Sequence, residues 1–400
     1  MDPAVGFALH PQAALPDGRG FHCQRPSAQF HCYGPAQIRN AYAIQPLIDA
    51  GQDGSGEVIT IIDAFQNPTM ARDLTRFDST FKLQSPPSFS TIAPFGLTAF
   101  DPNNADQVSW AGEIALDVEW AHAVAPGAKI VLALARSNAD ADIVATERYV
   151  IDNNIGNVIS MSYGEAERCE DPTLRAAEHS LFDTATARGV SLFAAAGDFG
   201  AAQLTCDASS YVKAVSIPAS DPDVTGVGGT QLKADLKTGA YHAESVWNDP
   251  ANSGVGGGGF STIYARPSFQ NGVEGVGSMR GVPDVAYSAA LDGGVIVAFG
   301  SSGSPGEFWI FYGTSVGTPQ WAAIVAIADQ SAGRALGNVN AALYDLGVGD
   351  LKDVAVFHDI TTGNNDFPPI SGYAAHPGWD AASGLGSPIA SRVVGGLARR

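Results

Sequence analysis

The stretch EVITIIDAFQNPTMARDLTRFDSTF, residues 57–81, joins a run of apolar and β-branched residues to an amphipathic segment. The first part predicts a buried strand, and the second predicts a helix with Pro68 near its start. We expect further buried strands at KIVLALA (129–135), NVISMSYG (157–164) and SLFAAAGD (191–198). Helical segments separate these strands. The alternation therefore predicts a parallel sheet with right-handed crossovers and helices on both faces.

Two of the intervening helices have clear boundaries. One is expected from residue 139 to about residue 153. The other, in DPTLRAAEHSLFDTATARG, has Asp171 as its N-cap, Pro172 at its first position and Gly189 as its stop.

The second half of the chain changes in character. Residues 224 to about 313 are rich in glycine and read as strands in VGGTQLK, GGVIVAFG and EFWIFYG, and a long helix is expected from about Ser315. The C-terminal tail reads mostly as loop. Because no repeat or linker divides the chain, we predict an N-terminal arm (residues 1–31) and one large α/β domain (residues 32–400).

The composition excludes several classes of protein. The 400 residues include 41 Asp and Glu against 22 Lys and Arg, a formal net charge of −19 at pH 7. No basic stripe is visible, which argues against a nucleic-acid or anionic-membrane partner. No apolar run approaches the roughly 20 residues that span a bilayer. An excess of carboxyl groups suits a protein that works in acid, where protonation relieves self-repulsion.

The chain has four cysteines: Cys23, Cys32, Cys169 and Cys206. None forms a C-x-x-C pair, which argues against a zinc ribbon or a redox motif. An even, sparse count fits two disulfides in an exported protein, and four buried free thiols are the alternative. The first twenty residues lack the basic and apolar regions of a signal peptide, so any export signal is expected to be absent, removed or replaced.

The segment YGTSVGTPQWAA, residues 312–323, is a candidate nucleophile site. Ser315 is expected where a strand ends and a helix begins, so the positive end of the helix dipole favours a reactive hydroxyl there. Gly313 and Gly317 would leave room for a substrate backbone. The alternative is that Ser315 merely caps the helix.

A nucleophilic serine needs a base, and none of the eight histidines occupies a motif that would present it to Ser315. His122 comes nearest in context. The helix containing GEIALDVEWAHAV instead carries Glu113 and Asp117 one turn apart on one face. Two carboxyl groups at that spacing either lie on a solvated face or share a proton as a coupled acid–base pair. In acid, such a carboxylate can serve as the general base.

A third candidate is Asp198 in SLFAAAGDFGA, which directly follows a predicted strand in a Gly-flanked turn. A protonated Asp198 could donate a hydrogen bond to a developing oxyanion. The alternative is an ordinary turn aspartate. Asp63, at the end of the first strand, could support Glu113 or be structural.

Together these segments resemble the sedolisins, the serine-carboxyl peptidases with a subtilisin-like fold. The resemblance runs from CYGPAQIRNAYAI at residue 32 to GLGSP at residue 387 and includes VGGGGFS and RGVPDVA. It implies that Ser315 is the nucleophile, Glu113 the base, Asp117 the group that orients Glu113, and Asp198 the oxyanion donor. SMSYG is similar to the family's substrate-pairing strand, which implies that Ser162 and Gly164 bind substrate.

The resemblance also implies a secreted, acid-acting endopeptidase that cleaves proteins or peptides. We expect a monomer, and a mature-type catalytic domain without the family's usual prodomain. Tyr163 stands where some members have tryptophan. Pairing of Cys169 with Cys206 and of Cys23 with Cys32 is expected.

The tail offers oxygen ligands of the kind that Ca²⁺ prefers. HDITTGNN supplies Asp359 and the carbonyl of Ile360, and HPGWD supplies Asp380. The resemblance adds the carbonyls of His376 and Gly378, which predicts one structural calcium ion.

Two other functions remain open at this stage. One is a neutral subtilase that uses His122 as its base, and the other is a catalytically silent, calcium-stabilised binding protein. A nucleotide-binding protein is disfavoured, because GVGGGGF lacks a following Lys-Ser/Thr and falls in a Gly-rich loop region.

Overall fold

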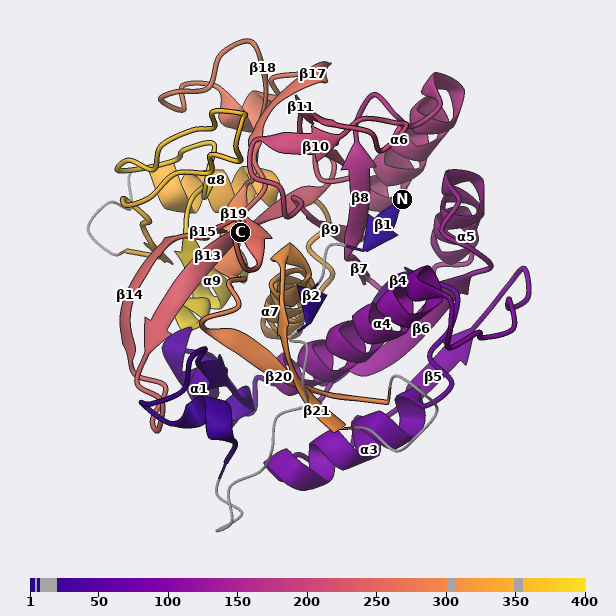
Figure 1. The fold of residues 1–400 in the computed structure, drawn as a ribbon, viewed down its shortest axis with the longest axis vertical. Helices are drawn as coiled ribbons and strands as arrows, with labels where there is room; N and C mark the ends of the chain where they lie inside the picture. Colours follow the sequence, from indigo (N-terminus) through magenta and orange to yellow (C-terminus); the bar gives the residue numbers. More distant parts are fainter. Residues whose placement is uncertain (4–5, 8–19, 301–306, 349–354) are drawn as a thin grey trace.

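The computed structural model describes residues 1–3, 6–7, 20–300, 307–348 and 355–400. A mainly parallel sheet runs through the molecule (Figure 1). In spatial order its strands are β14 (Tyr241–Val246), β13 (Thr225–Ala234), β9 (Ser191–Ala195), β7 (Val158–Met161), β4 (Val58–Ala64), β6 (Lys129–Ala135) and β5 (Phe89–Ile92). β19 (Val285–Ser288) also pairs with β13, and of these strands β14 alone is antiparallel to its neighbour.

Helices cover both faces of this sheet (Figure 1). α4 (Ala105–Val124) and α7 (Thr318–Ala332) pack on one face, and α5 (Asp140–Asp152) and α6 (Pro172–Ala187) pack on the other. α3 (Met70–Phe81) lies against α4, and α9 (Ala390–Leu397) lies against α7. The predicted fold class, a single subtilisin-like α/β domain with helices on both faces, is confirmed.

The period of two along β4 divides its side chains between two cores. Ile59 and Ile61 belong to the core under α4 and α7, whereas Ile62 and Ala64 belong to the core under α5 and α6. By the same alternation, Asp63 points to the face that α4 covers.

Local sequence signals set the helix ends as expected. Asp171 caps α6, because its Oδ1 accepts hydrogen bonds from the backbone nitrogens of Thr173 and Leu174, and Pro172 takes the first helical position. α6 ends at Ala187, shortly before Gly189.

Two expected boundaries are corrected. The segment 157–164 is two strands, because β7 ends at Met161 and β8 (Tyr163–Ala166) leaves the main sheet. β8 instead pairs with β1 (Asp2–Pro3) and β12 (Ser216–Ile217). The helix expected from Ser315 begins as a 3₁₀ turn, Thr314–Val316, and the α-helix starts only at Thr318.

A smaller sheet contains β2 (Gly6–Phe7), β21 (Glu307–Tyr312), β20 (Gly294–Phe299) and β3 (Cys32–Tyr33). The remaining described elements are short helices and strands: α1 (Pro35–Ala41), α2 (Gln45–Asp49), α8 (Asn340–Val348), the 3₁₀ turns His22–Gln24 and Ser268–Gln270, β10 (Ala202–Leu204), β11 (Tyr211–Lys213), β15 (Asn248–Asp249), β16 (Gly254–Val255), β17 (Gly259–Ala265), β18 (Met279–Val282), β22 (Phe357–His358) and β23 (Ser387–Pro388).

Both expected disulfides are present, Cys23–Cys32 and Cys169–Cys206, so the alternative of four free thiols is wrong. Among the described residues, no helix has the length and apolar character that crossing a bilayer requires. Of the predicted N-terminal arm, residues 4–5 and 8–19 lie outside the described residues.

Candidate active site

Ser315 lies in the 3₁₀ turn between β21 and α7 and is fully buried. Gly313, which precedes the turn, has φ 124°, a conformation that a residue with a side chain rarely adopts. The Oγ of Ser315 donates a hydrogen bond to the carbonyl of Ser162 at 3.2 Å. The break between β7 and β8 therefore brings Ser162 to the nucleophile candidate.

Glu113 and Asp117 lie one turn apart on α4, and both are fully buried rather than solvated. Burial raises the pKa of Glu113 well above its usual range; the neighbouring charge of Asp117 adds to this, and a hydrogen bond with Ser315 opposes it. The carboxyl oxygens of Glu113 make no hydrogen bond of ordinary geometry to the described residues, so the contact with Ser315 is loose. A loose contact of this kind is common in active sites without substrate.

Asp117 is held from the side of β7. Ser162 Oγ donates to Asp117 Oδ1 at 3.0 Å. Burial raises the pKa of Asp117 to about 8, against the hydrogen bonds from Ser162 and Glu113. Ionising both of two interacting buried carboxyl groups is unfavourable, which favours one proton shared between them.

Asp63 joins this pair from the end of β4. It is fully buried, and neither of its carboxyl oxygens has a hydrogen-bond partner in the described part of the chain. Burial together with the charge of Asp117 raises its pKa well above the usual range. The role of Asp63 was open from the sequence, and the structure brings it to Asp117 and Glu113.

Asp198 is anchored by the residue that precedes the serine. Its Oδ1 accepts hydrogen bonds from the backbone nitrogen and the hydroxyl of Thr314, both at 2.8 Å. Desolvation raises the pKa of Asp198 to about 7, although these hydrogen bonds oppose it. The group is therefore protonated in acid and can donate a hydrogen bond. Sequence reasoning missed Thr314, although it directly precedes Ser315.

A pocket of about 280 Å³ lies beside Asp198. Its walls include Gly164, Tyr312 and the disulfide residues Cys169 and Cys206. Gly164 has no room for a side chain, since an added Cβ would lie 2.6 Å from the carbonyl oxygen of Ile217.

His122 lies away from these groups. It is nine residues beyond Glu113 on α4, which corresponds to about 14 Å along the helix axis. Its Nε2 lies 3.2 Å from Oδ1 of Asp78 on α3, and both side chains are buried. His122 therefore contacts Asp78 of α3 rather than the candidate catalytic groups.

A hydrogen bond joins the two loops that carry the predicted calcium ligands. The backbone nitrogen of Gly378 donates to Asp359 Oδ2 at 3.1 Å, and that of His376 donates to Asp380 Oδ2 at 3.0 Å. The predicted ligands, carboxyl groups and backbone carbonyls, offer oxygen alone, and oxygen ligands suit Ca²⁺ better than a transition metal.

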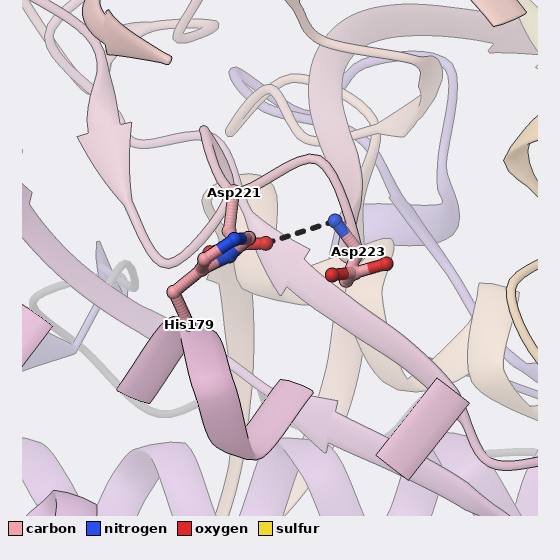
Figure 2. Close-up of side chains that lie close together, drawn as sticks. All are labelled: His179, Asp221 and Asp223. Atoms are coloured by element: carbon pink, nitrogen blue, oxygen red, sulfur yellow. Dashed lines mark hydrogen bonds and ion pairs between the residues drawn. The ribbon is translucent and has the colours of Figure 1, made fainter. Parts of the chain in front are cut away.

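The structure also shows a cluster that the sequence analysis did not identify. Figure 2 shows His179 of α6 against Asp221, with Asp223 beside them. His179 Nδ1 lies 2.7 Å from Asp221 Oδ2, and the possible ligand atoms of the three residues lie within 4.8 Å of one another. Because His179 and Asp221 are 42 residues apart, no local motif could have indicated this contact.

Comparisons with known proteins identify the family of the chain. The profile of the Subtilase family matches residues 99–342. Kumamolisin from Bacillus sp. is 35% identical over 393 residues, covering 94% of this chain and 66% of its own length. Sedolisin from Pseudomonas sp. is 31% identical over 297 residues, covering 71% of this chain and 48% of its own length. This chain thus spans about half to two thirds of these two relatives.

A solved structure of Pseudomonas sedolisin, described as a serine-carboxyl proteinase complexed with two molecules of pseudo-iodotyrostatin, is also similar. It superposes with a TM-score of 0.79 at 26% identity, over 92% of this chain and 98% of that one. The chain therefore belongs to the subtilase family and, within it, to the sedolisin-type peptidases.

Proposed function

We propose that the protein is a secreted serine-carboxyl endopeptidase that hydrolyses proteins or peptides in acid. One observation carries the proposal. Ser315 meets the buried Glu113–Asp117 pair, and His122 is engaged elsewhere with Asp78. The family supports a peptidase, and two disulfides support an oxidising compartment.

In the proposed acylation step, Ser315 Oγ attacks the scissile carbonyl carbon and its proton passes to Glu113. Asp117, one turn further along α4, is the group that orients Glu113 in this mechanism. Protonated Asp198 donates a hydrogen bond to the tetrahedral oxyanion. Glu113 then returns the proton to the leaving amine, and water attacks the acyl-enzyme by the same path in reverse.

This mechanism needs Glu113 to be ionised and Asp198 to be protonated at the same pH. Glu113 must be able to accept a proton, whereas Asp198 must keep its own. Because the pKa of Asp198 is raised to about 7, the oxyanion donor loses its proton as the pH rises through 7. The loss of this proton sets the upper pH limit of the proposed activity, and the raised pKa of Glu113, which must be ionised to accept a proton, sets the lower limit.

The substrate is proposed to bind as an extended strand beside Ser162 and Gly164. Strand addition uses backbone hydrogen bonds for affinity and side-chain pockets for selectivity. The pocket next to Asp198 is the proposed place for one substrate side chain.

We further propose that one Ca²⁺ ion binds Asp359, Asp380 and the carbonyls of Ile360, His376 and Gly378. When bound, the ion would supply charge that holds the two loops together. Chelation is expected to lower the melting temperature of the protein, and Asp380→Asn should remove this response to chelator. A melting temperature that chelator leaves unchanged would contradict the calcium site.

The decisive experiment measures cleavage of a denatured protein between pH 2.5 and 8. Ser315→Ala should abolish cleavage, and Glu113→Gln should lower kcat/KM by about 10²- to 10⁴-fold, the usual contribution of a general base. The matched control is Glu119→Gln. Glu119 is a buried carboxyl group on the same helix, but it accepts from the backbone nitrogen of Ala298 at 2.9 Å.

The outcomes separate the alternatives. Cleavage confined to acid, lost in Glu113→Gln and kept in Glu119→Gln supports the proposal. Cleavage that peaks near neutrality, survives Glu113→Gln and fails in a folded His122→Ala variant supports the neutral subtilase. A folded protein that cleaves nothing at any pH supports the silent binding protein.

A further inference from the structure

A buried amide without a hydrogen-bond partner lines the pocket beside Asp198. Gln203 of β10 is 5% exposed, and its Nε2 has no partner in the described part of the chain. Such unpaired donors are uncommon in folded proteins, because each one costs free energy. Since Gln203 forms part of the pocket wall, a group bound in the pocket lies within its reach.

The amide head group lies next to the candidate oxyanion donor. A Cβ atom added to Gly197 would lie 2.6 Å from Gln203 Nε2, so the amide occupies the space beside that glycine. Gly197 directly precedes Asp198. The unpaired donor is therefore close to the place where the scissile carbonyl is expected.

Ser216 of β12 supplies a second polar group to the same wall. It is 1% exposed, and its Oγ donates a long hydrogen bond of 3.4 Å to the carbonyl of its neighbour Ile217. The added Cβ of Gly197 would lie 3.8 Å from Ser216 Cβ, and the Oγ lies against Gly164 of β8. The hydroxyl of Ser216 and the amide of Gln203 thus flank one glycine.

The position of the amide is fixed from two sides. β10 pairs with β11 and packs against β8 (Figure 1). The Cys169–Cys206 disulfide joins the turn after β10 to the segment that follows β8. A polar group on such a rigid support discriminates well between ligands, because little conformational entropy is lost when the ligand binds.

The pocket offers no positive charge. None of its described lining residues is lysine, arginine or histidine, and its carboxyl groups are those of Asp2, Glu165 and Asp198. Burial raises the pKa of Glu165 and that of Asp198 to about 7, so both groups are uncharged in acid. Asp2 is exposed, and solvent screens its charge. Hydrogen bonding rather than charge therefore discriminates between side chains in this pocket.

The position of Asp198 indicates which substrate residue enters the pocket. The oxyanion is the carbonyl oxygen of the residue on the N-terminal side of the cleaved bond, so the side chain of that residue is nearest to the oxyanion donor. An amide side chain there can accept from Gln203 and donate to Ser216, because an amide has both an acceptor and donors. A thioether or hydrocarbon side chain would leave both groups without a partner.

We propose that Gln203, together with Ser216, is a specificity-determining residue that selects substrates with glutamine or asparagine on the N-terminal side of the cleaved bond. The inference rests on the proposed function, which it deepens by naming the substrate class. Its structural content, a hydrogen-bonding pocket for an amide, does not depend on turnover.

The first test measures cleavage. Internally quenched peptides of one sequence carry glutamine, methionine, glutamate or lysine at the tested position, and mass spectrometry identifies the cleaved bond. At pH 4 the glutamine peptide should have a kcat/KM about tenfold above that of the methionine peptide, the effect of one hydrogen bond to an otherwise unpaired buried group. In Gln203→Met this ratio should fall to about one.

The matched control is Gln107→Met. Gln107 is 6% exposed, and its Oε1 accepts from the backbone nitrogen of Asp101 at 2.8 Å, away from the pocket wall. The ratio should stay about tenfold in this variant. If Gln203→Met does not fold, Ser216→Ala replaces it and should lower the ratio in the same direction, because it removes the second polar group.

The pH dependence separates hydrogen bonding from charge. A glutamate side chain can imitate glutamine only while it is protonated. The preference for the glutamate peptide over the methionine peptide should therefore disappear as the pH rises through about 4.3, the ordinary pKa of glutamate, whereas the preference for glutamine should persist. A preference for lysine over glutamine would contradict the inference, as would a glutamine preference that survives in Gln203→Met.

The second test measures binding without catalysis. In a Ser315→Ala background, fluorophore-labelled glutamine and methionine peptides are titrated at pH 4 and followed by anisotropy. The glutamine peptide should bind about tenfold more tightly than the methionine peptide. Adding Gln203→Met to this background should abolish the difference.

The two tests give distinguishable failures. Glutamine-selective binding that depends on Gln203, without cleavage by any protein that retains Ser315, keeps the pocket assignment and refutes the proposed function alone. Cleavage without a glutamine preference overturns the inference and keeps the proposed function. Absence of both cleavage and selective binding overturns both.

Discussion

Replacing Glu147 by glutamine is expected to weaken the pH dependence of stability. Glu147 of α5 is fully buried, and its Oε1 accepts a hydrogen bond from the hydroxyl of Tyr163 in β8 at 2.9 Å. Its second oxygen has no hydrogen-bond partner of ordinary geometry among the described residues, and Glu178 of α6 is its buried acidic neighbour. Burial raises the pKa of Glu147 from 4.5 to about 7, although hydrogen bonds from Tyr163 and Glu178 oppose it.

The direction and the size of the effect on the free energy of unfolding follow from the linkage between proton binding and folding. Because the folded state holds the proton more tightly than the unfolded chain, the stabilisation is fully present below pH 4.5. It is lost as the pH rises to about 7. The change in pKa corresponds to about 3 kcal/mol of unfolding free energy. The glutamine side chain cannot ionise, and it keeps an oxygen that can accept from Tyr163. Between pH 4.5 and 7 the free energy of unfolding of the Glu147→Gln variant should therefore fall by about 3 kcal/mol less than that of the parent protein.

The assay is guanidinium unfolding followed by tryptophan fluorescence at several values between pH 4 and pH 7.5, in a Ser315→Ala background that prevents self-digestion. Buried carboxyl groups that do not interact with Glu147 titrate in both proteins and cancel in the difference between the two curves. Glu178, whose pKa is raised in part by the charge of Glu147, adds a change in the same direction. Glu274→Gln, at an exposed position, is the matched control and should follow the parent protein. Parallel curves for Glu147→Gln and its parent would refute the reasoning.

Three further predictions concern the fold around the site. Cys206→Ser removes the Cys169–Cys206 disulfide and should lower the free energy of unfolding by about 4 kcal/mol, the chain-entropy value for a 37-residue separation. If reductant left the free energy of unfolding of the parent protein unchanged, this prediction would be wrong. His122→Ala removes a fully buried ring that contacts α3 and should cost about 3 kcal/mol in denaturant melts, while the pH profile of cleavage stays unchanged. A shifted profile would implicate His122 in catalysis. Gly164→Ala should lower the free energy of unfolding by about 1–3 kcal/mol and raise KM, because the new methyl group would overlap a backbone carbonyl of β12. The control Gly277→Ala has open space around the new methyl group and should change neither the free energy of unfolding nor KM.

The buried carboxyl groups have a common consequence for the working range. Burial raises the pKa of Asp117 to about 8 and that of Asp198 to about 7, and Glu147 behaves in the same way. Each such group stabilises the fold most when it is protonated, so the free energy of unfolding should fall as the solution approaches neutrality. Both the proposed activity and the free energy of unfolding are therefore expected to be higher below neutral pH than above it.

The local pattern of the sequence was enough to predict the architecture. Apolar runs such as EVITIIDAF bury strands on both faces, and Asp171 with Pro172 starts α6 because capping depends on neighbouring residues alone. The strand–turn–helix around Ser315 and the one-turn spacing of Glu113 and Asp117 are local features too. Their resemblance to a known family indicated roles for these residues, and those roles stay predictions until they are measured.

Only the tertiary structure decided which distant side chains meet. Asp63 reaches Asp117 because β4 lies beneath α4, and Thr314 reaches Asp198 because the 3₁₀ turn after β21 packs against β9. The contact of Glu147 with Tyr163, the pairing of His122 with Asp78 and the docking of residues 1–3 on β8 likewise join remote segments. Periodicity in a sequence reports whether a position is buried. The partner of a buried polar group depends on how elements pack against one another, and packing is a property of the whole fold.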